Sequence, residues 1–143
     1  MLSIDINNKH LEVFEDLNLQ AETDGHARWF LSKKGEVVQH NLLNGQWLLY
    51  NASDGLIDSP VRLISTATGQ IIVSGSHNQE AAVAMLKNGK WTKKVFPRCC
   101  IYFDYRSLIE LSDGTVLVGA SNAAYHWKNP GLGYIGTCLL KAA

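Results

Sequence analysis

The tetrapeptide Asn44-Gly45-Gln46-Trp47 returns 44 residues later as Asn88-Gly89-Lys90-Trp91, and Gly133-Tyr134 follows after a further 44 residues. Asn-Gly favours the left-handed backbone that a tight hairpin turn needs at both of its central positions. Each copy therefore predicts a hairpin at the same place in a repeating unit. Self-similarity at a fixed period of this length is typical of repeat architectures.

A second series of turns has almost the same period. Asp24-Gly25, Thr68-Gly69 and Asp113-Gly114 are separated by 44 and 45 residues. An apolar run follows each turn, at 29–31, 71–73 and 116–118, and an alternating run precedes it. Two turn series in one register indicate a repeat of about 44 residues.

Each unit is interpreted as four antiparallel strands joined by short turns. In the middle unit we expect strands at 61–67, 70–75, 81–87 and 90–96. The unit before it predicts 17–23, 28–32, 36–41 and 46–51, and the unit after it predicts 106–112, 115–120, 123–128 and 133–140. Residues 2–6 and 10–14 are expected to be the last two strands of one more unit.

The segment 79–87 favours a helix on intrinsic propensity alone, because it is rich in alanine and other helix-forming residues. The equivalent segments Glu36-Val37-Val38-Gln39-His40 and Ala124-Tyr125-His126-Trp127 do not have a helical composition. The repeat therefore predicts a strand here, with a helix as the alternative.

The expected fold is all-β: a β-propeller segment of about three four-stranded antiparallel blades plus a half blade. The half blade is 1–16, and the blades are 17–51, 61–96 and 106–140. Small sheets that are apolar on both faces bury them by stacking on their neighbours. A ring normally has four to eight blades, so we expect either missing blades from a longer chain or self-association.

Composition excludes some classes of partner. The chain has 143 residues with 13 Lys+Arg against 13 Asp+Glu, and this balance disfavours nucleic-acid binding, which normally needs a basic excess. No apolar stretch is long enough for a membrane span, and the first residues lack the features of a signal peptide. The three cysteines, Cys99, Cys100 and Cys138, have no zinc-site or disulfide-framework spacing.

The segments 54–61 and 68–73 read Asp-Gly-Leu-Ile-Asp-Ser-Pro-Val and Thr-Gly-Gln-Ile-Ile-Val. Together they resemble the two-component-regulator propeller repeat, which carries Asp-Gly-Leu, a loop, Val, a short strand, Asp-Gly and then a strand with Trp. The match is partial at 112–120 and weaker at 24–32, where Trp29 fits the tryptophan position. The expected tryptophan is replaced by Ile72 in one copy and by Leu117 in another.

The resemblance implies a sensor or interaction propeller. Such propellers commonly form the extracytoplasmic half of hybrid histidine kinases and are associated with oligosaccharide recognition, so a longer parent protein would place this segment in the periplasm or outside the cell. The leading hypothesis is therefore non-catalytic binding of an oligosaccharide or protein ligand. A fragment of a carbohydrate-acting propeller enzyme, a lyase or glycosidase, is one alternative, and a scaffold without a small ligand is another.

Propeller topology places the loops at 51–60, 97–105, 32–35, 76–79 and 121–122 on one face. Loops on a rigid scaffold often carry function, and Tyr and Arg are favoured at binding hot spots. The candidate binding residues are Arg98, Tyr102, Asp104, Tyr105, Asp54 and Asp58. The segment 98–105 could alternatively plug the central opening.

No sequence motif indicates catalysis, and no cofactor or metal is predicted. The five histidines lack metal-ligand spacing, and His40 and His126 occupy similar places in two of the three units. Aspartates in turns usually bond their own backbone. Trp29, Trp47, Trp91, Trp127 and Tyr134 recur near the same landmarks, which predicts packing between blades, with a sugar-stacking platform as the alternative.

Overall fold

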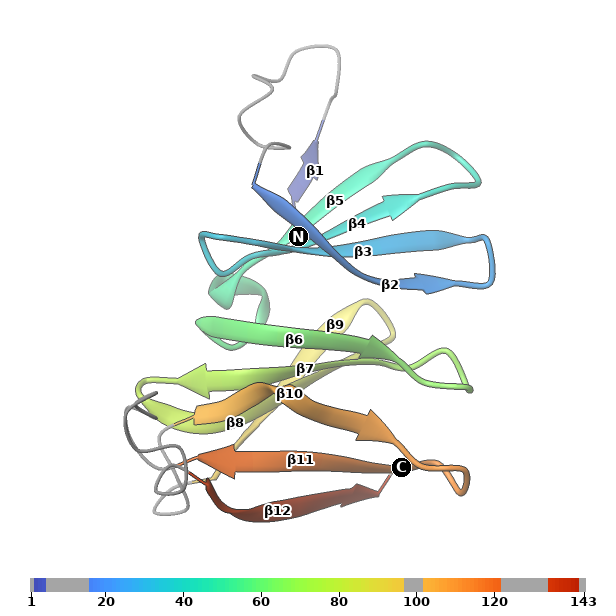
Figure 1. Cartoon of the computed structure of the whole chain (residues 1–143). Helices are drawn as coiled ribbons and strands as arrows, with labels where there is room; N and C mark the ends of the chain where they lie inside the picture. The colour runs from blue at the N-terminus through green and yellow to red at the C-terminus, as the bar shows by residue number, and fades with distance from the viewer. Residues whose placement is uncertain (1, 5–15, 97–101, 122–133, 142–143) are drawn as a thin grey trace.

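The computed structural model describes residues 2–4, 16–96, 102–121 and 134–141, with side chains over 16–96 and 108–119. Its described part is all-β apart from one short 3-10 helix, and every strand pairing is antiparallel. Three sheets lie one above another (Figure 1). The all-β prediction is confirmed.

The first sheet has the order β1-β5-β4-β3-β2, and the second has β6-β7-β8-β9. Their strands are β1 Leu2–Ile4, β2 Leu17–Thr23, β3 Ala27–Ser32, β4 Val37–Asn41, β5 Trp47–Tyr50, β6 Ser59–Ser65, β7 Ile71–His77, β8 Glu80–Lys87 and β9 Lys90–Val95. The eight strands expected between residues 17 and 96 are all present. The helix alternative for 79–87 is wrong, because these residues form β8 between two hydrogen-bonded neighbours.

The third sheet differs from the expected four-strand pattern in its described residues. Its order is β10-β11-β12, with β10 Tyr102–Glu110, β11 Thr115–Ser121 and β12 Tyr134–Lys141. β12 pairs directly with β11, the place that the repeat assigns to a strand at 123–128. That expected strand lies outside the described residues. β10 also begins at Tyr102, four residues before the expected start at residue 106.

The N-terminal residues do not start a separate sheet where the structure describes them. Leu2 pairs with Leu49 and Ile4 with Trp47, so β1 extends the first sheet beyond β5. This pairing satisfies the backbone groups that an edge strand would otherwise expose. Leu2–Ile4, which were expected in a separate half blade at 1–16, lie in the first sheet instead. The expected strand at 10–14 lies outside the described residues.

Alternate residues of the second sheet pack against the sheets on its two sides. Ile71 and Val73 of β7 join the core shared with the first sheet, whereas Ile72 between them joins the core shared with the third sheet. Successive side chains of a strand point to opposite faces, so an unbroken apolar run fits a strand buried on both sides. Strands β2, β6 and β10, the first of each expected unit, lie next to one another along the stack.

Trp47 and Trp91 occupy equivalent positions in successive sheets. Trp47 pairs with His40 and Trp91 with Leu86, each one pair beyond the end of its hairpin. The turns before them differ. Asn88 and Gly89 form a two-residue turn with φ of 52° and 75°, whereas the first hairpin has a four-residue loop closed by the Asn41 N–H donating to Gln46 O at 2.8 Å.

Candidate functional site

Three loops meet at one edge of the stack, on the left of Figure 1. They are residues 32–35, 51–60 and 76–79, which we call the loop face. The Asn78 N–H donates to Asp58 Oδ2 at 2.9 Å, and a Cβ added to Gly35 would lie 2.8 Å from Asp58 O. The sequence predicted that these three loops share a face, and the structure brings them together around Asp58.

The 51–60 loop owes its shape to its own polar side chains. The short helix η2, Ala52–Asp54, begins after Asn51, whose Oδ1 accepts from the Ser53 N–H at 2.9 Å. Asp54 Oδ2 accepts in return from the Asn51 N–H at 2.9 Å, which completes a capping box. Gly55 ends the helix with φ of 92° and lies against Trp91 O. The Asp54 carboxylate therefore shapes the loop, as expected of a turn aspartate.

Asp58 and His77 lock two of the loops together. The Asp58 N–H donates to His77 Nδ1 at 3.2 Å, and Asp58 Oδ2 lies 3.5 Å from the same nitrogen. His77 Nδ1 is the acceptor of the Asp58 N–H bond. The Asp58 side chain is 37% exposed, so its carboxylate is also accessible to a ligand.

A hollow of about 310 Å³ opens at the same edge, between the starts of β2 and β6. Its polar part includes Asn18, which is exposed, and the ion pair of Lys33 Nζ with Asp16 Oδ1 at 3.0 Å. Pro60 and Val61 supply an apolar wall, and Val61 is 38% exposed. Polar groups beside an apolar wall, in a volume at the small end of ligand pockets, suit a ligand of mixed polarity.

The predicted site residues do not all assemble here. Asp54 and Asp58 lie at the loop face, but Tyr102, Asp104 and Tyr105 belong to strand β10 instead of the expected loop. The register between β10 and β11 shifts between Phe103 and Leu108, so a bulge interrupts the pairing beside them. Arg98 lies outside the described residues.

Sequence reasoning missed Asp16, Asn18 and Lys33 as members of a site. Ser32, Lys33 and Pro60 do lie in loops or loop ends that the topology placed on this face. Asp16 and Asn18 come from the start of β2, and only the pairing of Leu17 with Ser32 brings them beside the 32–35 loop. No local motif signals that pairing.

The tryptophans of the inter-sheet core support packing over sugar stacking. Trp29 and Trp91 are 4% and 5% exposed. Tyr50 lies between them, with ring centroids 6.4 Å from Trp29 and 5.7 Å from Trp91, and burial raises the pKa of Tyr50. Trp127 lies outside the described residues, and the Tyr134 side chain is not described.

His40 and Asp113 make contacts that serve the fold. His40 stacks on Trp47 with ring centroids 3.9 Å apart, and burial followed by the charge of Arg28 lowers the pKa of His40. Asp113 Oδ1 accepts from the Thr115 N–H at 2.9 Å, and this bond lowers the pKa of Asp113. Within the described residues, no group of three or more His, Cys, Asp or Glu could bind a metal ion.

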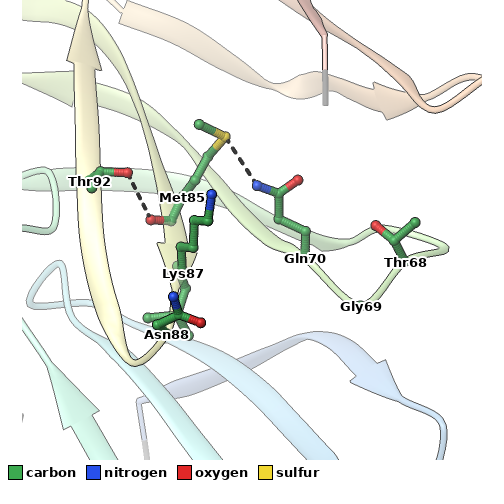
Figure 2. A pocket seen from close by; sticks show the side chains of 8 residues that line it. Thr68, Gly69, Gln70, Met85, Lys87, Asn88 and Thr92 are labelled. Carbon is green, nitrogen blue, oxygen red and sulfur yellow. Dashed lines mark hydrogen bonds between the residues drawn. The ribbon is translucent and has the colours of Figure 1, made fainter. Parts of the chain in front are cut away.

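A second hollow, of about 460 Å³, lies at the opposite edge of the second sheet (Figure 2). Residues of the β6–β7 and β8–β9 turns line it, together with the adjoining ends of their strands. Its described lining includes none of the predicted site residues.

Among the described residues, no helix has the length and hydropathy needed to cross a membrane.

No protein-family model, curated protein or solved structure matches this chain.

Proposed function

We propose that this chain is a non-catalytic binding module, an arc of β-propeller blades that binds an oligosaccharide at its loop face. The observation that carries the proposal is the convergence of the 32–35, 51–60 and 76–79 loops beside the hollow between β2 and β6. The blade interpretation is supported by the stacked sheets and by the adjacency of β2, β6 and β10.

The chemistry of the hollow favours a polyhydroxylated ligand. Asn18 offers an amide, Lys33 an ammonium group and Asp16 a carboxylate, all partly or largely exposed. Sugars need such donors and acceptors for their hydroxyl groups, while their ring faces pack on apolar surface such as Pro60 and Val61. The likeness to sensor propellers drawn from the sequence points to the same ligand class.

The enzyme alternative requires two carboxylates that face one cleft at a defined separation. In the described part of the loop face, Asp54 caps its own helix and Asp58 accepts from the Asn78 backbone, and in the adjoining hollow Asp16 pairs with Lys33. These engagements favour binding over hydrolysis as the role of this face.

Calorimetric titration of the chain with maltotriose, cellotriose and mannotriose tests the proposal. We expect saturable binding of at least one trisaccharide, weakened by Asn18→Ala and Lys33→Ala by about 1 kcal/mol or more, the threshold for an interface residue that matters. Lys34→Ala is the matched control, because Lys34 lies in the same turn but does not line the hollow. Arg98→Ala tests the contribution of the segment 98–105.

Asn18→Ala and Lys33→Ala change exposed side chains, so the thermal unfolding of these two variants should match that of the original chain. Binding that is unaffected by Asn18→Ala and Lys33→Ala would place the ligand elsewhere. A chain that binds none of these sugars but pulls out a defined protein would favour the scaffold alternative.

A further inference from the structure

The 460 Å³ hollow at the turn edge of the second sheet has a lining unlike that of the loop face. Gln70, Met85 and Thr92 form its floor, and Figure 2 shows their side chains with Lys87 beside them. Gln70 Nε2 donates to Met85 Sδ at 3.5 Å, and Thr92 Oγ1 donates to Met85 O at 3.4 Å. Thr68 and Asn88 complete the polar rim, at the tips of two turns.

Positive charge gathers on this face of the hairpin. Lys87 lines the hollow and pairs with Lys90 across the turn. Because side chains alternate along a strand, Lys90 and Lys94 share the face of Thr92. Lys94 Nζ lies 5.2 Å from the centroid of Phe96, which packs with the core on that side of the sheet.

Among the residues that the structure describes, no carboxylate lines the hollow. The chain as a whole is neutral, yet four of its 13 basic residues lie between positions 87 and 94, where no acidic residue occurs. Glu110 approaches from the third sheet, but its Oε2 and Oε1 accept from the Ala67 N–H at 2.9 and 3.2 Å. The Glu110 carboxylate is therefore bound to backbone.

Protection of an exposed strand edge explains only part of this charge. Lysines on edge strands discourage pairing with other chains, and β9 is the outer edge of the second sheet. Lys87 ends the inner strand β8, whose pairs with β7 stop at Leu86 and whose pairs with β9 reach Lys87. Its side chain lines the hollow at this turn edge.

We propose that this hollow is a binding site for a small polyhydroxylated anion, a sugar acid or a sugar phosphate. Lys87, which lines the hollow, would hold the anionic group, since an ammonium forms its stronger hydrogen bonds with charged oxygen. Gln70 and Asn88 offer two amides and Thr92 a hydroxyl to the ring hydroxyls, and Met85 offers apolar contact. The volume accommodates one or two sugar rings.

Calorimetric titration of the full chain with glucuronate, glucose 6-phosphate and glucose tests this site. We expect the two anions to bind and glucose to bind at least about fivefold more weakly, because it lacks the charged group. The tighter of the two anions identifies carboxylate or phosphate as the recognised group. Affinity should fall as sodium chloride is raised to about 0.5 M, where screening shortens the range of charge interactions.

Lys87→Gln should weaken binding of the anion by about fivefold. Lys93→Gln is the matched control. Lys93 projects from the opposite face of the sheet, and its substitution removes the same charge from the chain. Gln70→Leu provides a second test without any change of charge, and it should weaken the binding of glucuronate. Thermal unfolding of this variant checks that it still folds.

Equal effects of Lys93→Gln and Lys87→Gln would overturn the site, since they would reveal general charge attraction only. Equal affinity for glucose and glucuronate, or no binding of either anion, would overturn it too. Asn18→Ala and Lys33→Ala, in the hollow beside the loop face, should leave anion binding at the Lys87 hollow unchanged. This result distinguishes the anion site from the proposed oligosaccharide site.

Discussion

His77 Nδ1 accepts the backbone N–H of Asp58 at 3.2 Å, across 19 positions of sequence. The bond joins the loop before β6 to the end of β7, and Asp58 Oδ2 accepts a further bond from the Asn78 N–H at 2.9 Å. The position of the loop face therefore depends on one histidine and one aspartate that no motif pairs.

Replacing His77 by Ala should lower the free energy of unfolding by about 0.5 kcal/mol, the low end for a hydrogen bond, because the Asp58 N–H is exposed and can bond to water instead. Urea denaturation followed by tryptophan fluorescence measures the change. His26→Ala is the control, since His26 is exposed in the β2–β3 turn. Equal losses for the two variants would mean that the His77 bond contributes nothing specific.

Gly75→Ala should destabilise the fold by about 2–3 kcal/mol, because an added Cβ collides with Ser59 O in the neighbouring strand. Gly75 does not have a positive φ, so the cost is one of space and not of backbone strain. Gly69→Ala serves for comparison: its surroundings are open, and its φ of 82° costs only about 1 kcal/mol. Denaturant midpoints at constant m-value give both numbers. A smaller loss for Gly75→Ala than for Gly69→Ala would contradict the close approach of β6 and β7.

His40 should make the chain less stable as the pH falls below 6.5. Burial and the charge of Arg28 lower its pKa in the folded state, so the unfolded chain binds a proton at a pH where the folded chain does not. Stability is lost between the unfolded and the folded pKa, and the loss levels off once both states are protonated. Melting temperatures across this range should fall less steeply for His40→Gln. An unchanged slope would show that other groups dominate the acid response.

The outer faces of the first and third sheets should promote self-association. Leu19 and Ile109 are 54% and 51% exposed, on the strands β2 and β10 that lead the two outer sheets. Exposed apolar sheet faces tend to be covered by association, so sedimentation velocity should show dimers or larger species. Leu19→Ser and Ile109→Ser should shift the distribution towards monomer, with Leu43→Ser, at an exposed loop, as the control. A monomer at high protein concentration before any substitution would contradict this expectation.

Turn chemistry and apolar periodicity were sufficient to predict most of the strands. Asn88-Gly89 specifies its two-residue turn through its own backbone preferences. The run Ile71-Ile72-Val73 has no polar face, so it required burial on both sides, which the structure provides. Asn44-Gly45 shows the limit of such reasoning, because its flanking residues allow a longer loop that still leaves Trp47 in register with Trp91.

The candidate sites could be predicted only in part, because they depend on distant pairings. Ser32, Asp58 and His77 were placed on one face by topology alone, but the hollow also needs Asn18, which the β2–β3 register supplies. The Lys87 hollow received no prediction, since Lys87 and Thr92 come from different strands and only the β8–β9 register brings them to one edge.

Local sequence determined where this chain turns, which segments extend and which runs must be buried, since these follow from backbone preferences and side-chain polarity over a few residues. The pairing of β12 with β11, the addition of β1 to β5 and the two hollows depended on tertiary structure. Backbone hydrogen bonds between strands are chemically alike whatever the partner. Which neighbour a strand pairs with therefore depends on how well the complete sheets bury apolar surface and satisfy the hydrogen-bonding groups at their edges.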